Sequence, residues 1–239
     1  MNQIEQLQKI IDQAQNIVFF TGAGVSTDSG IPDFRSTDGL YAMEYDFPPE
    51  TIISHSFFLE NPKEFYRFYK NKMIYEQAQP SITHNFIAAC ESKGKSLGVI
   101  TQNIDGLHTL AGSKTVIELH GSTLRNTCTK CKKKHPLFSI TSCQDVPRCS
   151  CGGIIKPDVV LYEEALNEKD LFDSVKMIRG ADVLIVLGTS LTVYPAAGLI
   201  RYFKGSHLVI INKSTTDYDE RADLCIKAPL KEVLSQIKV

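Results

Sequence analysis

Short apolar runs alternate along the chain with longer stretches of amphipathic character. An unbroken apolar run is typical of a strand that is buried on both faces, as in a parallel sheet. The runs cover residues 17–21, 97–101, 116–119, 183–187 and 208–212. Residues 1–15 form a polar amphipathic pattern, and further helical stretches cover 81–92, 167–178, 196–202 and 230–237. This alternation predicts an α/β protein built on an open, Rossmann-like parallel sheet.

Two segments break the alternation. Residues 36–80 contain no clear strand but carry aromatic side chains at helical spacings, so we expect a helical insertion that covers one edge of the functional site. Residues 125–156 are rich in Cys, Lys and Gly, and they cannot bury enough apolar surface to fold without a staple. The expected organisation is a large domain made of residues 1–124 and 157–239, with a small module at 125–156.

Two cysteine pairs provide such a staple. Cys128-x-x-Cys131 and Cys149-x-Cys151 enclose 17 residues, which suits a tetrahedral four-cysteine zinc site on two short turns. Four thiolates leave no open position for water, so we expect one structural Zn²⁺ in a zinc-ribbon module. Cys143 lies between the pairs and is the alternative to Cys149.

Composition and charge narrow the choice of partners. The net charge of −1 gives no general attraction to nucleic acid or to an anionic membrane. No apolar run approaches the ~20 residues of a membrane span, and we see no secretion signal. The seven cysteines are therefore expected to be thiols or metal ligands. We expect a cytoplasmic monomer with no specific nucleic-acid or membrane partner.

The most specific segment follows the first predicted strand. From Thr21 to Arg35 it is Thr-Gly-Ala-Gly-Val-Ser-Thr-Asp-Ser-Gly-Ile-Pro-Asp-Phe-Arg. A strand, a glycine turn and a polar stretch form the layout of a dinucleotide site, because Gly22 and Gly24 let the backbone approach a pyrophosphate. The glycines at 22, 24 and 30 do not have the G-x-G-x-x-G spacing of ordinary dinucleotide-binding folds, however.

This segment resembles the signature of the sirtuins, a family of NAD-consuming protein lysine deacylases. Further blocks agree in the family's order: Thr-Gln-Asn-Ile-Asp-Gly-Leu-His at 101–108, His-Gly at 120–121, the four cysteines, and Gly-Thr-Ser at 188–190. The resemblance covers nearly the whole chain. It implies removal of acetyl or related acyl groups from lysines of proteins or peptides, with NAD as co-substrate. The products would be nicotinamide, O-acyl-ADP-ribose and free lysine.

The resemblance also implies roles for individual residues. His120 directly follows the predicted strand at 116–119, at the carboxyl end where α/β sheets place ligands, and it is the expected general base. Asn103 is the second expected catalytic residue, positioning ribose hydroxyls or a water molecule. The expected NAD contacts are Ala23, Thr27, Phe34, Arg35, Gln102, Asn103, Ile104, Asp105, Gly188, Thr189, Ser190 and Asn212.

The acyl-peptide is expected to pair as an added strand with the segment after Lys156. The family usually has Val-Val-x-Phe-Gly-Glu there, whereas this chain has Val-Val-Leu-Tyr-Glu-Glu at 159–164. We expect Glu163, at the glycine position, to face the peptide and to favour basic residues around the target lysine. Some sirtuins that remove acidic acyl groups carry Tyr-x-x-Arg, but Tyr69 and Lys72 lack the bidentate fork of arginine, so simple acyl groups are the better expectation.

Two other functions fit parts of the sequence. A protein mono-ADP-ribosyltransferase would use NAD on the same fold, with a protein side chain as the acceptor. His120 argues against it, because deacylation is the reaction that needs this base. A non-catalytic module, with the zinc ribbon contacting nucleic acid, would rest on the lysine-rich stretch at 130–134 alone.

Overall fold

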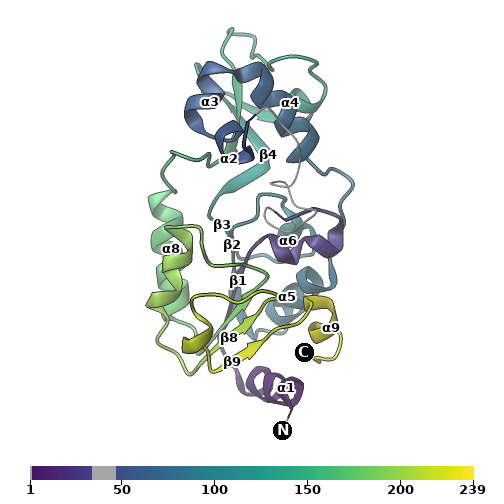
Figure 1. Ribbon diagram of the computed structural model, residues 1–239, viewed down its shortest axis with the longest axis vertical. Helices are drawn as coiled ribbons and strands as arrows, with labels where there is room; N and C mark the ends of the chain where they lie inside the picture. Colours follow the sequence, from purple (N-terminus) through teal and green to yellow (C-terminus); the bar gives the residue numbers. More distant parts are fainter. Residues whose placement is uncertain (1, 34–46) are drawn as a thin grey trace.

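The computed structural model describes residues 2–33 and 47–239, and its larger sheet is parallel throughout (Figure 1). The strand order is β3-β2-β1-β7-β8-β9. The strands are β1 Ile17–Thr21, β2 Ser96–Thr101, β3 Val116–Glu118, β7 Val183–Leu187, β8 His207–Ile211 and β9 Leu224–Ile226. The predicted Rossmann-like sheet is confirmed. The sequence pattern missed β9, because three residues are too few to distinguish a strand from a buried loop.

Alternate residues of the central strands point into two separate cores, one on each face of the sheet. On β1, Ile17 and Phe19 belong to one core, whereas Val18 and Phe20 belong to the other. Helices α1 (Gln3–Gln13), α5 (Ile82–Ser92) and α9 (Leu230–Leu234) cover the first face. Helix α8 (Glu168–Arg179) and the 3₁₀ helix η4 (Ala196–Tyr202) cover the second. Burial on both faces explains why these strands are continuous apolar runs.

A second, smaller sheet has the antiparallel order β5-β4-β6. Its strands are β4 Gly121–Cys128, β5 Lys134–Pro136 and β6 Ile155–Val159. The predicted helical insertion contains α2 (Pro49–Ile52), α3 (His55–Glu60) and α4 (Pro62–Lys72), which lie beside β4 at the top of Figure 1. The short helix α7 (Phe138–Thr141) belongs to the cysteine-rich segment.

The helical insertion and the cysteine-rich segment share one hydrophobic cluster. Aromatic side chains of α3 and α4 pack there with residues such as Cys128, Ile140 and Ile155. Phe65 and Tyr69 stack at 5.6 Å between ring centroids. The insertion thus supplies the apolar surface that residues 125–156 lack.

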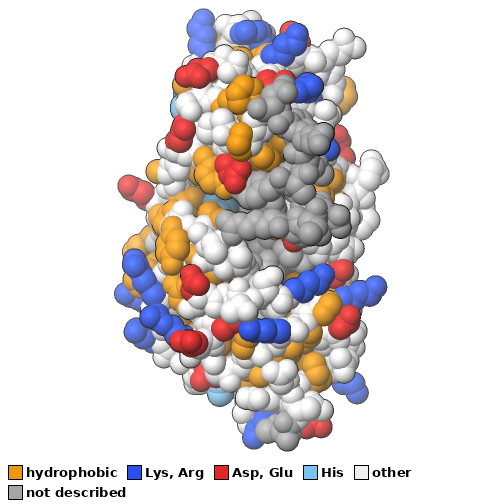
Figure 2. Space-filling model, viewed as in Figure 1, with side chains coloured by type: hydrophobic (Ala, Val, Ile, Leu, Met, Phe, Trp, Pro, Cys, Tyr) orange, Lys and Arg blue, Asp and Glu red, His pale blue; other side chains and the backbone are white. Residues whose placement is uncertain are grey.

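The remaining short helices lie in connections: η1 Ala23–Val25, η2 Thr27–Ser29, α6 Leu107–Leu110 and η5 Asp219–Arg221. Within the described ranges, the chain has no helix of sufficient length and hydrophobicity to cross a membrane. On the face shown in Figure 2, hydrophobic side chains gather between the upper part, which holds α2, α3, α4 and β4, and the lower part, which holds the parallel sheet. Charges of both signs are interspersed over the rest of this face.

Candidate active site

The carboxyl ends of the central strands place the predicted NAD residues side by side. The register aligns Thr21 with Thr101 on one side of β1 and with Leu187 on the other. The chain moves outward from β1 through β2 and β3, then returns to β7 on the opposite side of β1. Such a reversal is a topological switch point, where open α/β sheets bind ligands. The next residues along the three strands are Gly22, Gln102 and Gly188.

Glycine is required where the turn after β1 meets the turn after β7. A Cβ atom on Gly22 would lie 2.6 Å from Thr189 Cβ, and one on Gly24 would lie 2.8 Å from Gly188 Cα. The Gly24 N–H donates to the Gly188 carbonyl at 2.8 Å. This contact between two turns explains a glycine spacing that differs from the ordinary dinucleotide fingerprint. The close approach brings backbone groups of both turns together at this edge of the sheet, which suits a pyrophosphate.

Ala23 and Thr27 begin the two short helices of this first turn. The Thr27 hydroxyl donates to the Gly24 carbonyl at 3.0 Å and so stabilises the turn.

Asn103 and Asp105 meet through a serine that the sequence analysis did not single out. The Asn103 Nδ2 group donates to the Gly22 carbonyl at 3.1 Å and to Ser26 Oγ at 3.0 Å. The Ser26 hydroxyl in turn donates to Asp105 Oδ2 at 2.7 Å. Asp105 Oδ1 accepts the Leu107 N–H at 2.9 Å. This network fixes both side chains, and the position of Ser26 between two glycine turns was the signal available in the sequence.

Gln102 and Ile104 complete the loop after β2. The Gln102 side-chain amide donates to Thr189 Oγ1 at 3.0 Å and so connects the loops after β2 and β7. The Ile104 carbonyl accepts the Thr123 N–H at 2.9 Å and its hydroxyl at 3.1 Å.

The ring of His120 is oriented by the same loop. Its Nδ1 lies 2.8 Å from the Gln102 carbonyl. A carbonyl can only accept, so Nδ1 carries the hydrogen and Nε2 keeps its lone pair. Burial lowers the pKa of His120, and the hydrogen bond to the Gln102 carbonyl offsets only part of this decrease. The ring is therefore neutral near pH 7, as a general base requires.

The backbone beside His120 is held equally closely. Gly121 has a φ of +75°, and a Cβ atom there would lie 2.0 Å from the Asp158 carbonyl oxygen. The Val160 N–H donates to the His120 carbonyl at 2.9 Å. Strand β6 and the residue after it thus lie directly against His120.

The other predicted NAD residues lie at the outer part of this edge or outside the described residues. Ser190 Oγ lies 2.8 Å from Thr192 Oγ1. Asn212 directly follows β8 and donates to the Ser214 carbonyl at 2.9 Å. Phe34 and Arg35 fall outside the described residues.

Two buried histidines lie next to each other and to the last residue of β1. The rings of His84 and His108 are 4.6 Å apart between centroids, and His108 Nε2 lies 3.0 Å from Thr21 Oγ1. His84 Nδ1 accepts the Ser81 N–H at 3.1 Å as the third residue of helix α5. That spacing, Ser-x-x-His before an apolar stretch, resembles a capping box and was the only trace of the pair in the sequence.

The four paired cysteines form one cluster. Their sulfur atoms all lie within 4.8 Å of one another. The Cys128–Cys151 and Cys131–Cys149 sulfur distances are 3.5 Å and 3.7 Å, close to the ~3.8 Å edge of a tetrahedron with Zn–S bonds of about 2.3 Å. The cluster fits one structural Zn²⁺. Cys143, the alternative ligand, is not part of it.

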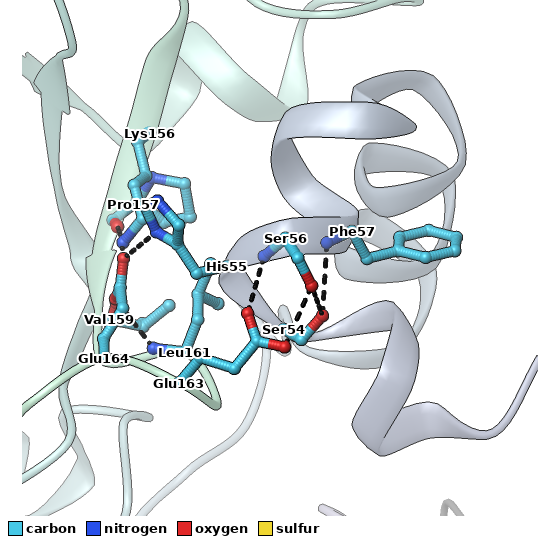
Figure 3. Close-up of polar contacts among 10 residues, drawn as sticks. All are labelled: Ser54, His55, Ser56, Phe57, Lys156, Pro157, Val159, Leu161, Glu163 and Glu164. Atoms are coloured by element: carbon cyan, nitrogen blue, oxygen red, sulfur yellow. Dashed lines mark hydrogen bonds and ion pairs between the residues drawn. The ribbon is translucent and has the colours of Figure 1, made fainter.

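The carboxylate of Glu163, which we expected to face the peptide, makes contacts within the protein. Its two oxygens accept hydrogen bonds from the Ser56 N–H and hydroxyl, each at 2.9 Å (Figure 3). Tyr69 is only 1% exposed and packs in the core of the helical insertion, whereas Lys72 is half-buried.

Comparisons with known proteins agree with this geometry. The model of the Sir2 family matches residues 22–195. An "NAD-dependent protein deacetylase" of Clostridium acetobutylicum is 53% identical over 99% of this chain and 98% of its own length. One of the same name from Cutibacterium acnes is 52% identical over 98% and 97%.

Solved structures give the same result. A Sir2 structure with a deacetylated p53 peptide and 3′-O-acetyl ADP ribose has a TM-score of 0.89 and 38% identity, covering 98% of this chain and 97% of that one. A Sir2 structure with a p53 peptide and NAD⁺ has a TM-score of 0.85 and 38% identity, covering 99% and 97%. This chain belongs to the Sir2 family.

Proposed function

We propose that this protein removes acetyl groups from lysine side chains of proteins or peptides in an NAD-dependent reaction. Relatives that match almost its full length are named NAD-dependent protein deacetylases. The observation that carries the proposal is His120, a neutral base whose Nε2 keeps its lone pair, held against the loop after β2 by the Gln102 carbonyl. When bound, NAD would supply the ADP-ribosyl group that receives the acetyl group, with nicotinamide as the leaving group and one water molecule consumed.

The residues around the switch point have distinct roles in this proposal. His120 withdraws a proton from a ribose hydroxyl through Nε2. Asn103 orients the ribose or a water molecule, and its own amide is fixed by Gly22 and Ser26. Asp105 and the backbone of Ile104 hold the nicotinamide carboxamide, and Gln102 contacts the ribose.

The phosphates and the adenosine lie farther along the same edge in this proposal. Ala23 and Thr27 line the phosphate turn, and the N–H groups of that turn bind the pyrophosphate. The adenosine side is bound by Gly188, Thr189, Ser190 and Asn212. Phe34 and Arg35 are proposed to shield the reacting carbon and to contact the pyrophosphate.

The acetyl-lysine peptide is proposed to lie along the segment that follows β6. The bond between the Val160 N–H and the His120 carbonyl supports this placement, since a peptide paired there would lie beside the base. Simple acyl groups are the proposed substrates, because Tyr69 is packed in a core and Lys72 lacks the fork of arginine.

The test is product analysis with purified protein, NAD and an acetyl-lysine peptide. We expect mass spectrometry to detect free lysine in the peptide together with nicotinamide and O-acetyl-ADP-ribose. Protein that carries covalently bound ADP-ribose, found in place of O-acetyl-ADP-ribose, would favour the mono-ADP-ribosyltransferase. A parallel series with succinyl-lysine and longer acyl-lysine peptides would determine the preferred acyl group.

We also propose that the protein is a cytoplasmic monomer without nucleic-acid partners. All seven cysteines are free of disulfides, which supports a reducing compartment. The chain is proposed to divide into a large domain of residues 1–124 and 157–239 and a zinc module of residues 125–156. Light scattering of the purified protein tests the oligomeric state.

A further inference from the structure

The turn after β6 has an unusual conformation for its sequence. The Glu164 N–H donates to the Leu161 carbonyl at 3.0 Å, which closes a four-residue turn over 161–164. Glu163, the third residue of this turn, has a φ of 75°, and Tyr162 is not among the residues with positive φ. This is the φ pattern of a type II turn, which favours glycine at the third position. A glutamate there carries backbone strain, which persists only when contacts elsewhere offset it.

The side chain of Glu163 makes such contacts with helix α3. One carboxylate oxygen accepts the Ser56 N–H and the other accepts the Ser56 hydroxyl, each at 2.9 Å. The two residues are 107 positions apart in the sequence. Figure 3 shows the carboxylate of Glu163 reaching from its turn to the first turn of α3. The backbone runs alongside, since the Tyr162 carbonyl accepts the His55 N–H at 3.0 Å.

Glu164 makes a second, parallel connection. One of its oxygens accepts a hydrogen bond from His55 Nδ1 at 2.8 Å, and the other contacts Lys156 Nζ at 3.0 Å. Burial alone raises the pKa of Glu164, but the Leu161 N–H, His55 and Lys156 outweigh it, so its pKa is lowered. Adjacent glutamates thus bind adjacent residues of α3.

The turn is also connected to the catalytic base. Val160 precedes it directly, and the Val160 N–H donates to the His120 carbonyl at 2.9 Å. A shift of the turn relative to α3 would therefore move the segment beside His120. We propose that Glu163 is a positioning residue. Its bonds to Ser56 fix the turn at 161–164 against α3 and thereby orient the segment after β6, along which the acetyl-lysine peptide is proposed to bind. This inference rests on the proposed function.

Kinetics with an acetyl-lysine peptide test the proposal. Glu163→Ala is expected to raise the peptide KM by roughly 3- to 30-fold, which lies within the range of coupling between contacting residues, with kcat and the KM for NAD within about twofold of wild type. Ser56→Ala should have a smaller effect, because the N–H of that residue remains. The double variant should be no worse than Glu163→Ala. Glu76→Ala, at an exposed glutamate of another segment, is the matched control and should behave as wild type.

Two further variants separate the side chain from the backbone. Glu163→Gln keeps an acceptor for Ser56 and should restore most of the peptide affinity. Glu163→Gly relieves the backbone strain of the turn but loses the contact with Ser56, so its peptide KM should rise as in Glu163→Ala. A wild-type peptide KM in either Glu163→Ala or Glu163→Gly would overturn the proposal.

The charge of Glu163 gives a rival explanation with a different signature. If Glu163 positions the turn, the ratio of KM for an acidic and a basic peptide should be the same in wild type and Glu163→Ala. A ratio that flattens in the variant, and that shrinks with salt in the wild type, would show direct contact with the substrate and would also overturn the proposal.

Hydrogen exchange separates a failure of this inference from a failure of the proposed function. Amide exchange at 53–57 and 161–164 should be faster in Glu163→Ala than in wild type, whatever reaction the protein catalyses. Unchanged exchange would refute the positioning contact. Absence of deacetylation by the wild type, with faster exchange in the variant, would refute the function but leave the contact in place.

Discussion

At the scale of single residues, the site depends on how polar side chains are held by fixed backbone groups. The hydrogen bond to the Gln102 carbonyl sets the tautomer of His120, and bonds to the Gly22 carbonyl and Ser26 orient the side chain of Asn103. Such partners remove the entropy that would otherwise be lost on reaching the reactive geometry.

Replacing His120, the proposed base, gives the most direct prediction at this scale. His120→Ala should bind NAD nearly as wild type does, since the proposed phosphate contacts lie in other turns. Its deacetylation rate should fall about 10²- to 10⁴-fold, the usual contribution of a general base. Calorimetric NAD binding and kcat, measured side by side, check both parts. Deacetylation close to the wild-type rate would refute the assignment.

The pH dependence of the reaction follows from the environment of His120. Because burial lowers its pKa below the ordinary value of 6.5, the proposed base stays mostly unprotonated as the pH falls from 8 to that value. The acid side of the kcat/KM profile should therefore reach half-maximum below pH 6.5. A profile measured from pH 4.5 to 8.5 tests this. Half-maximal activity well above pH 6.5 would contradict the lowered pKa.

At the scale of elements, the zinc cluster and the helical insertion stabilise the same part of the molecule. The cysteine-rich segment contributes Cys128 and Ile140 to the shared cluster, while α3 and α4 contribute the large aromatic rings. Gly153 lies so close to the cluster that a Cβ atom would be 2.7 Å from Cys128 Sγ. The metal and the aromatic packing therefore stabilise the same part of the molecule.

Removing a ligand should affect both the metal and the fold of this part. Cys128→Ala or Cys149→Ala is expected to lose zinc and to cost about 4 kcal/mol, which lowers Tm by about 8–16 °C for a chain of this size. Cys143→Ala, the matched control, should keep one zinc per chain. Elemental analysis and thermal unfolding give the answer. Zinc lost with Cys143 and kept with Cys149 would reverse the ligand assignment.

At the scale of the whole molecule, a neutral histidine pair is buried where α5 and α6 meet the end of β1. Burial lowers the pKa of His84 to about 4, with Asp105 acting in the opposite direction. Burial lowers the pKa of His108 to about 3, and the charge of His84 contributes in the same sense. Both histidines are protonated in the unfolded chain below pH 6.5 and remain neutral in the folded one.

This difference predicts how stability depends on pH. The unfolded state binds more protons below pH 6.5, so stability is fully present above that value and falls as the pH decreases toward 4 and 3. Each histidine adds about 1.4 kcal/mol per pH unit to the slope. Urea unfolding at pH 7, 6 and 5 measures it, and His84→Gln should remove one such increment. Equal slopes in wild type and variant would exclude His84 as a cause.

The sequence by itself determined the layered α/β fold and the cysteine cluster. Strands buried on both faces leave continuous apolar runs such as 183–187, and metal ligands on tight turns keep short, countable spacings. Both signals are local, so they can be read without knowing which segments meet. The resemblance to the sirtuins then indicated which residues along the chain form the site.

Only the tertiary structure decided which distant residues meet. Ser26 with Asp105, His84 with His108, and Glu163 with Ser56 join different loops and helices, and no local pattern encodes such pairs. Glu163 illustrates the reason. Its sequence position suggested a charge facing the substrate, but the positive φ of its turn and the packing of α3 direct the carboxylate to Ser56. Side-chain direction depends on backbone conformation and on neighbouring elements, and both are fixed only when the chain folds.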